Sequence, residues 1–493
     1  MVCITHCLKD LTRNLDLEDD ALSSYAFQSW WHHSKLVAGE LFNQRLLDFI
    51  IALCRERHLD RRRGLDGEID QGYRVDNAFL NPEEGLRAGF NPCLMVVFLD
   101  LMHLYPRVQH LHEPSSSFQL NALHIAARAG NQRAIDIFLS QDTLPPLSTI
   151  LNSPNASGRT PLMLACQYGE DGVVHSLLQC PTVDVHATDD GGHTPLHLAS
   201  WKGHFRVVDL LLAHPCDPPI NVNAATTDGT TALHQASRWG HFSVVEALLA
   251  HSAHSSVDVN IADASGWTAI HHATAAGRFD VIQLLIAHSS EPPVNLNAAT
   301  AEGLTALHIA SREGSLRIVQ TLLMNTVHPS TNINTADNDG WTPLHYASLT
   351  DNQPSLDILT FLLAHPSDPP VNLNAVATDG MTPLHVASRR GNLRTVQILL
   401  AHPGISPINV DAVDTDGWTA LHHASYFGHL LVIKELLDRG ASLNIRTADG
   451  ETALILASRN RYHENKQVKR TAEAFLLTLP DIDVDGYSYE PDP

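Results

Sequence analysis

The stretch TPLHLASWKGHFRVVDLLLAH, residues 194–214, contains the pattern that decides the fold of this 493-residue chain. Thr194 stands where an N-cap hydroxyl accepts from a first-turn amide, and Pro195 follows at the first helical position, where a missing N–H costs nothing. Gly203 comes about two turns later and can take the left-handed conformation that ends a helix. Apolar residues then recur every three or four positions, which predicts a second amphipathic helix antiparallel to the first; they are Phe205, Val208 and Leu211 or Leu212.

The same phrase, Thr-x-Leu-His-x-Ala or a close variant, occurs ten times between Asn121 and Ala457. Successive phrases start 33 to 40 residues apart, and the four steps from Thr194 to Thr342 are each 37 residues long. A unit of this size cannot bury its apolar face alone, so the units are predicted to stack into a solenoid. The phrases start at Asn121, Thr160, Thr194, Thr231, Thr268, Thr305, Thr342, Thr382, Thr419 and Thr452.

Polar, turn-rich segments connect each second helix to the next phrase. An example is HPCDPPINVNAATTDG, residues 214–229, which ends on the pair Asp228-Gly229. Asp-Gly is typical of tight turns, so this segment predicts a projecting, hairpin-like turn.

The phrase, the Gly after the first helix, Val-Val-x-Leu-Leu-Leu and the Val-Asn before Asp-Gly together resemble the ankyrin repeat family, from roughly Asn121 to Leu479. The resemblance implies an all-α solenoid of helix-loop-helix units with hairpin fingers, which binds other macromolecules on its concave side. The period is longer than the family's by about four residues, inserted before the finger. We expect these insertions to change the loops without breaking the helical stack; they include HPCDPPIN (214–221), HSSEPPVN (288–295) and HPSDPPVN (365–372).

This pattern divides the chain into four predicted parts. Residues 118–479 are about ten ankyrin repeats, residues 91–117 a degenerate repeat, and residues 480–493 an acidic, disordered tail. Residues 1–90 do not follow the repeat, but their apolar and aromatic residues have helical spacing, which predicts a helical N-terminal region and cap.

The N-terminal region also resembles the helical segment between the ATPase and the ankyrin array of fungal NACHT-type immune receptors. Tyr25, Ala26, Trp30 and His33 carry this resemblance. No phosphate-binding loop is present, so the ATPase of those receptors is absent. If the relation holds, the chain is a detached sensor half or begins at a truncated gene model; otherwise these helices only cap the array.

Composition limits the classes of partner. The formal net charge of −22 opposes the phosphate backbone of nucleic acid, so nucleic acid is not expected as a partner. The seven Cys are scattered without a CxxC pair, which indicates reduced thiols in an intracellular protein. No apolar run approaches the roughly 18 residues of a membrane span, and the start lacks a signal-peptide core. We expect a monomer in the cytoplasm or nucleus, with no membrane partner.

The 31 His do not predict a metal site. Stacked repeats place equivalent side chains about 10 Å apart, too far for one tetrahedral zinc. In the pairs His271-His272 and His422-His423 we expect one core and one surface residue. The phrase His bonds back toward the phrase Thr in the family and is interpreted as structural; these phrase histidines are His124, His197, His234, His271, His308, His345, His385 and His422.

No catalytic motif is present, and the recurring Asp-Gly pairs are interpreted as turns. We therefore predict that the chain is not an enzyme and uses no cofactor. Partner binding is assigned to positions that vary between repeats, because Trp and Arg dominate binding hot spots. The candidates are Trp201, Arg238, Trp239, Trp267, Arg312, Trp341, Tyr346, Arg389, Arg390, Trp418, Tyr426 and Phe427.

Two functions follow from these observations. The first is a non-catalytic scaffold or recognition module that binds a protein through the concave face. The second is the adaptor or sensor portion of a regulated machine, such as a NACHT-type receptor or a ubiquitin ligase, with the N-terminal helices as the coupling element.

Overall fold

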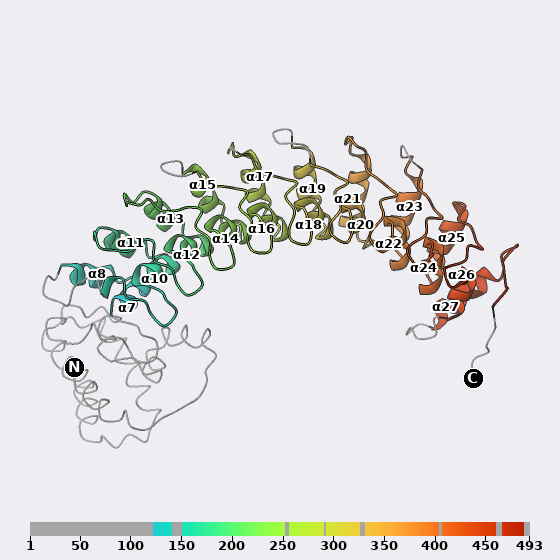
Figure 1. The fold of residues 1–493 in the computed structure, drawn as a ribbon, viewed down its shortest axis with the longest axis horizontal. Helices are drawn as coiled ribbons and strands as arrows, with labels where there is room; N and C mark the ends of the chain where they lie inside the picture. The colour runs from blue at the N-terminus through green and yellow to red at the C-terminus, as the bar shows by residue number, and fades with distance from the viewer. Residues whose placement is uncertain are drawn as a thin grey trace, which may run out of the picture. The chain divides into compact units, whose positions relative to one another are not determined.

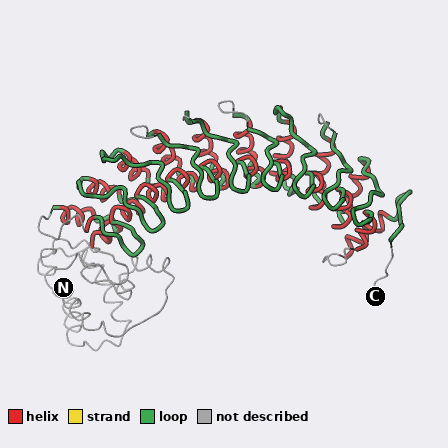
Figure 2. Tube along the Cα trace, in the orientation of Figure 1, coloured by secondary structure: helices red, strands yellow, loops and turns green. Residues whose placement is uncertain are grey.

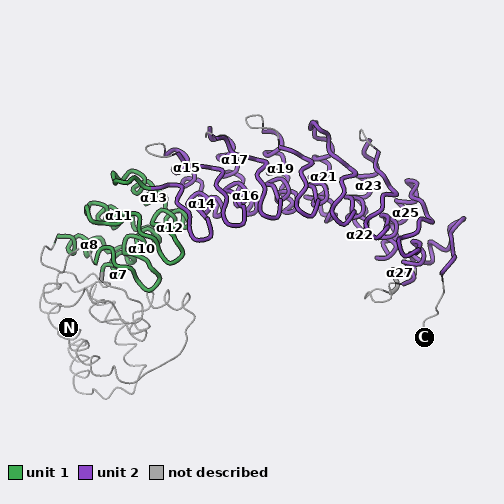
Figure 3. Tube along the Cα trace, in the orientation of Figure 1, with its two compact units in different colours: residues 1–220 green, residues 221–493 purple. Residues whose placement is uncertain are grey.

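The computed structural model describes residues 122–140, 150–251, 256–289, 292–325, 331–403, 407–459 and 466–487. The predicted helical region 1–90 and the degenerate repeat 91–117 lie outside these ranges. Helices joined by loops make up the described part of the chain, without a strand, as Figure 2 shows. The all-α prediction is therefore confirmed. The chain divides into two compact units, residues 1–220 and residues 221–493 (Figure 3).

The described part of unit 1 contains three helix pairs. We call the helix that carries the phrase the first helix of a repeat, and its partner the second helix. The pairs are α7 (Ala122–Arg128) with α8 (Gln132–Leu139), α10 (Pro161–Tyr168) with α11 (Asp171–Leu178), and α12 (Pro195–Lys202) with α13 (Phe205–Leu212).

The described part of unit 2 contains seven further pairs. Figure 1 shows its first helices side by side in one row and its second helices in another. The pairs are α14 (Ala232–Trp239) with α15 (Phe242–Ala250), α16 (Ala269–Ala275) with α17 (Phe279–Ala287), α18 (Ala306–Arg312) with α19 (Leu316–Leu323), α20 (Pro343–Ala347) with α21 (Gln353–Ala364), α22 (Pro383–Arg390) with α23 (Leu393–Ala401), α24 (Ala420–Phe427) with α25 (Leu430–Asp438), and α26 (Ala453–Arg459) with α27 (Lys466–Leu476).

The helix signals in residues 194–214 act as predicted, with one exception. Thr194 accepts a hydrogen bond from the backbone N–H of His197, and Gly203 ends α12 in the left-handed conformation with φ 77°. The expectation that Phe205 joins the buried stripe is wrong, because Phe205 is 43% exposed. The buried residues of α13 are Val207, Val208 and Leu211. Phe205 lies about 110° around the helix from the centre of that stripe.

The fingers of unit 2 are tight turns, and each is hydrogen-bonded to the finger that follows it in that unit. In the finger of residues 226–230, Gly229 has φ +80°, and a Cβ at this position would lie 2.8 Å from the backbone N of Ala264. That same amide donates to the carbonyl of Asp228 at 2.9 Å. Equivalent bonds join the later fingers of unit 2, for example from Thr378 to Asp339 at 2.8 Å. The interpretation of Asp-Gly as turn chemistry is confirmed.

Asparagine side chains form a second connection between neighbouring repeats. The amide of Asn334 donates to the carbonyl of Pro370 at 2.8 Å, and its side-chain oxygen accepts from the backbone N of Asn372 at 2.8 Å. The same bridging recurs at Asn223, Asn260 and Asn374. The inserted segments 288–295 and 365–372 end at residues that take part in these bridges, so the stack continues despite the longer period, as expected.

The end of the described chain differs from its prediction. Residues 480–493 were expected to be disordered, but residues 481–487 form a turn that contacts the last repeat. The amide of Asn444 donates to the carbonyl of Asp481 at 2.7 Å, and its oxygen accepts from the backbone N of Asp483 at 2.9 Å. Arg446 also pairs with Asp483. This acidic segment therefore takes the place of the loop that precedes a following finger, as Pro370 and Asn372 do for Asn334.

Candidate protein-binding surface

The phrase histidines of unit 2 join the first helix of one repeat to the next repeat, at or just before its finger. The Nδ1 atom of His385 lies 2.8 Å from the hydroxyl of Thr382, and its Nε2 atom lies 3.0 Å from the carbonyl of Ala412 and 3.1 Å from that of Trp418. A carbonyl can only accept, so Nε2 carries the proton and Nδ1 accepts. In this repeat the His385 ring thus bonds to the cap of its own helix and to backbone carbonyls of the next repeat.

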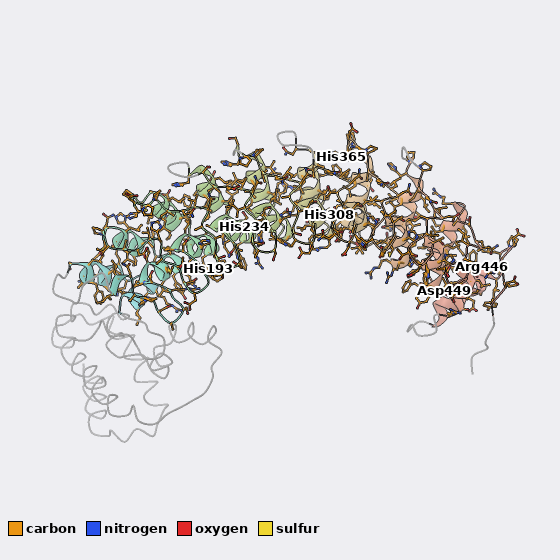
Figure 4. The ribbon with its side chains drawn as sticks, in the orientation of Figure 1. His193, His234, His308, His365, Arg446 and Asp449 are labelled. Atoms are coloured by element: carbon orange, nitrogen blue, oxygen red, sulfur yellow. The ribbon has the colours of Figure 1, made fainter. Side chains whose placement is uncertain are left out.

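Burial keeps most phrase histidines neutral. Desolvation lowers the pKa to about 4, although the hydrogen bonds to backbone carbonyls favour the protonated form. This holds for His124, His234, His271, His345, His385 and His422. Figure 4 places His234 and His308 among the first helices and His365 at the end of α21. The rings of the phrase histidines therefore serve packing and hydrogen bonding between repeats.

The second residue of each His-His pair is not a surface residue, contrary to expectation. The Nε2 atom of His272 lies 2.9 Å from a carboxylate oxygen of Asp263, and that of His423 lies 2.8 Å from Asp414. The side chain of His423 is only 8% exposed. The preceding finger places a carboxylate beside the first helix, and this carboxylate provides the second ring with a polar partner inside the protein.

This arrangement belongs to a set that occurs three times in unit 2. In the repeat that starts at Thr342, Asp337 takes the equivalent place and accepts a hydrogen bond from the hydroxyl of Tyr346 at 2.7 Å. In each set the other carboxylate oxygen accepts from the backbone N–H of the Trp four residues later, at 2.8 to 2.9 Å. We call these the aspartate-tryptophan sets; they are Asp263-Trp267-His272, Asp337-Trp341-Tyr346 and Asp414-Trp418-His423.

Burial and hydrogen bonds within the sets shift the pKa values of Asp414 and Tyr346. Burial alone would raise the pKa of Asp414, but hydrogen bonds from His423 and from the Trp418 amide outweigh it and hold the pKa below its usual value. Burial and the Asp337 carboxylate raise the pKa of Tyr346. The Asp414 carboxylate is therefore ionised, and Tyr346 stays neutral and donates a hydrogen bond to Asp337.

The three Trp rings lie on the first helix of their own repeat and are partly exposed. The Trp267 ring centroid is 5.2 Å from that of His272, Trp341 is 5.3 Å from Tyr346, and Trp418 is 5.1 Å from His423. Trp418 also lies 5.3 Å from Tyr426. Each Trp thus has one face fixed by ring contacts and one side open to solvent.

The Arg candidates occupy the exposed ends of first helices. Arg312 Nε lies 3.2 Å from Glu313, and Arg389 lies 5.9 Å above the Phe427 ring of the following repeat. Arg389 also contacts Met381, the residue before its own phrase Thr. Trp418 likewise contacts Tyr426, so in these two repeats the residue before the phrase Thr and the residue seven positions after it form one patch, with which we group the equivalent positions of the other repeats. We call this patch, together with the residue eight positions after the Thr, the inner surface.

The remaining candidates fall on the inner surface as well. In unit 1, Trp201 is partly exposed, and Lys202 lies over its ring at 4.0 Å. In unit 2, Trp239 is 48% exposed next to the exposed Arg238, Arg390 is exposed, and Phe427 is partly exposed. Only Tyr346 lies below this surface, because its hydroxyl is directed to Asp337. Sequence reasoning missed Asp263, Asp337, Asp414, His272 and His423, although the recurring spacing Asp-x3-Trp-x4-His/Tyr marks them.

Two further observations limit what the described residues can do. No group of three or more His, Cys, Asp or Glu among them is arranged to hold a metal ion. No helix in the described ranges combines the length and the apolar character that crossing a membrane requires.

The sequence model described as "Ankyrin repeats (3 copies)" matches most of the chain in overlapping segments: residues 98–189, 170–261, 252–335, 292–375, 326–411, 352–447 and 405–469. The chain belongs to the ankyrin repeat family. Ankyrin repeats bind protein partners and are typically non-catalytic interaction modules.

Individual relatives match over about three repeats. The human photoreceptor ankyrin repeat protein is 37% identical over 99 residues, 20% of this chain and 21% of that protein. The E3 ubiquitin-protein ligase XBAT33 of Arabidopsis thaliana is 36% identical over 91 residues, 18% of this chain and 17% of that protein. Human NF-kappa-B inhibitor alpha is 34% identical over 103 residues, 20% of this chain and 31% of that protein. The matches thus cover about a fifth to a third of each relative.

Among solved structures, the crystal structure of the ankyrin repeat domain of Bcl-3 aligns with 27% sequence identity. The alignment covers 46% of this chain and 94% of that domain, with a TM-score of 0.40.

Proposed function

We propose that the chain is a non-catalytic scaffold that binds a protein partner through the inner surface, which corresponds to the concave side implied by the family. The observation that carries this proposal is the exposure of large aromatic and Arg side chains at positions that packing does not use. Trp239 is 48% exposed beside Arg238, and these residue types dominate binding hot spots.

Affinity capture with the full chain tests the proposal. The variant Trp201→Ala, Trp239→Ala, Arg389→Ala removes three inner-surface side chains. A matched control removes three exposed apolar side chains on or after second helices: Phe205→Ala, Met324→Ala and Leu431→Ala. The first variant is expected to lose proteins that the wild type and the control both retain. An unchanged set of captured proteins in the first variant would refute binding through this surface.

A second candidate is an adaptor within a regulated machine. The resemblance of a 91-residue segment to an E3 ubiquitin-protein ligase favours this class. Removing residues 1–117 separates the two functions. A scaffold keeps its partner after this truncation, whereas an adaptor still binds its target but loses the second component of the machine.

A further inference from the structure

The inner surface of unit 2 has a period of two repeats, laid over the period of one repeat that builds the fold. Trp precedes the phrase Thr in every second repeat, and Arg stands seven positions after the Thr in the repeats between. The resulting order is Arg238, Trp267, Arg312, Trp341, Arg389 and Trp418. No repeat in this run has both, since the Arg-bearing repeats carry Thr230, Leu304 and Met381 before the Thr, and the Trp-bearing repeats carry Ala275, Leu349 and Tyr426 at the helix end.

The next repeat ends the series. Arg459 stands at the equivalent place of an Arg-bearing repeat, but it pairs with Glu451, the residue before the phrase Thr of its own repeat. Glu451 is only 11% exposed, so Arg459 is held by a partly buried carboxylate. Arg312 also has an acidic neighbour, Glu313 at 3.2 Å, but both side chains of that pair are exposed, and such a pair is weak and leaves Arg312 accessible to a partner's carboxylate. Six consecutive positions remain to contact a partner, and both residue types are accessible: the three Arg are exposed and the three Trp are partly exposed.

The spacing of these positions fits an extended peptide. First helices of neighbouring repeats pack side by side, which sets their separation at about 8–10 Å. A polyproline II helix rises about 3.1 Å per residue with three residues per turn, so every third residue faces the same side about 9.3 Å further along. Aromatic surfaces recognise such segments because these are extended before binding and lose little entropy.

The positive charge of the three Arg positions, which alternate with the Trp positions, indicates acidic residues in the ligand. The three Arg are cationic positions on a protein with a formal net charge of −22, and guanidinium groups bind carboxylates in bidentate geometry. Exposed acids stand at the finger tips, among them Asp228, Glu302 and Asp379, each two residues before the inner-surface residue that precedes the phrase Thr. A continuous polyanion such as nucleic acid would meet these acids, whereas a peptide whose acids are spaced meets only the Arg.

The geometry points to one occupant: an extended, Pro-containing peptide segment of a partner in which acidic and Pro or other apolar residues alternate at every third position. The acids bind Arg238, Arg312 and Arg389, and the apolar residues pack on Trp267, Trp341 and Trp418. Six positions three residues apart span about 16 residues. This inference rests on the proposed function, because it names the ligand of the same surface.

Synthetic 18-residue peptides test it with the full chain. The probe is three copies of Glu-Ser-Ser-Pro-Ser-Ser, and binding is followed by fluorescence anisotropy. A peptide of the same composition with its Glu and Pro residues clustered, and one with Lys in place of Glu, are expected to bind at least tenfold more weakly. Arg312→Glu is expected to weaken binding of the probe about tenfold, and a probe with one Glu changed to Lys to recover part of that loss. Arg317→Glu is the matched control, since Arg317 belongs to the same repeat but lies over Phe279 on the second helices.

Equal binding of the spaced and clustered peptides would overturn the inference, and so would tighter binding of an oligonucleotide than of the probe. These outcomes are distinguishable from failure of the proposed function. If the inner-surface variant loses captured proteins while the spaced peptide has no advantage, the surface binds proteins but not this class of segment. If capture is unchanged in that variant, the proposed function itself fails.

Discussion

Replacing one buried Ser in the first helix with Ala is expected to stabilise the protein. The hydroxyls of Ser200, Ser237, Ser311, Ser388 and Ser425 are buried without a hydrogen-bond partner, and all stand six residues after the phrase Thr. Ser237 is 0% exposed. An unsatisfied buried polar group costs about 1–3 kcal/mol. The chain already uses Ala127 and Cys166 at the same place, so the packing accepts a side chain without a hydroxyl.

The expected gain for Ser237→Ala is about 1–2 kcal/mol in the local free energy of unfolding. Relief of the unsatisfied hydroxyl and the better helix propensity of Ala, worth a few tenths of a kcal/mol, favour the variant. The small void left by one oxygen atom opposes it at about 24 cal/mol per Å³. Native-state hydrogen exchange of the α14 amides measures the change locally, which suits a repeat array whose unfolding is not all-or-none.

Ser348 provides a control at the same position of another repeat. Its hydroxyl is equally buried but donates to the carbonyl of Leu344 at 2.8 Å. Ser348→Ala removes that bond and is expected to lower the free energy of unfolding by about 0.5–1.5 kcal/mol. The reasoning is refuted if Ser237→Ala destabilises α14 as much as Ser348→Ala destabilises α20, because the Ser237 hydroxyl would then have a partner.

Three further predictions concern the connections between repeats. Gly229→Ala is expected to cost more than Gly450→Ala, since both have φ near +80° but only at Gly229 would the new Cβ meet the next finger; urea midpoints that fall equally would contradict this. Asn334→Ala is expected to lower the free energy of unfolding by about 1–3 kcal/mol by removing both bridging bonds, and unchanged exchange of the Asn372 amide would argue against it. The phrase histidines have a pKa of about 4 in the folded protein and about 6.5 in the unfolded chain, so the unfolded chain binds protons more readily. Their contribution to the free energy of unfolding is therefore complete above pH 6.5 and falls by about 1.4 kcal/mol per pH unit and histidine as the pH decreases to 4. A melting temperature that stays constant from pH 7.5 to 4.5 would refute this.

The fold was predictable because its determinants are local in sequence. Thr194 caps a helix whose amides lie within three residues, and Gly203 ends the same helix. The position of Phe205 was harder to predict, since a run of apolar residues every three or four positions does not say which stripe faces the core. Burial depends on the neighbouring repeat, which the local pattern does not contain.

The candidate surface was predictable in part. The Trp and Arg positions were identified because they vary while the phrase stays constant. The partner of His423 was not identified, because Asp414 lies nine residues earlier, on the other side of the finger turn. Only the folded finger brings the two side chains together, although three equal spacings in the sequence were a sign that they act as a unit.

Within the two-repeat period, the Trp positions are coupled to buried contacts between repeats more closely than the Arg positions are. In each Trp-bearing repeat, the residue beneath the Trp also contacts the phrase His of the preceding repeat: His272 lies 5.4 Å from His234, Tyr346 5.9 Å from His308, and His423 5.7 Å from His385. Each Trp is thus coupled to a core contact with its neighbour, and a change there disturbs packing as well as the surface.

The contacts of the Arg positions lie at the surface instead: Arg312 pairs with Glu313, and Arg389 lies over the partly exposed Phe427 ring of the following repeat. Arg238, Arg312 and Arg389 stand exposed at helix ends and can change without altering the buried ring contacts. Substitutions at the Arg positions can therefore change the charges that this surface prefers in a ligand, while the Trp positions keep the spacing between its apolar residues unchanged. For the proposed peptide ligand, we therefore expect the Arg positions to determine charge specificity and the Trp positions to determine the spacing of the apolar residues.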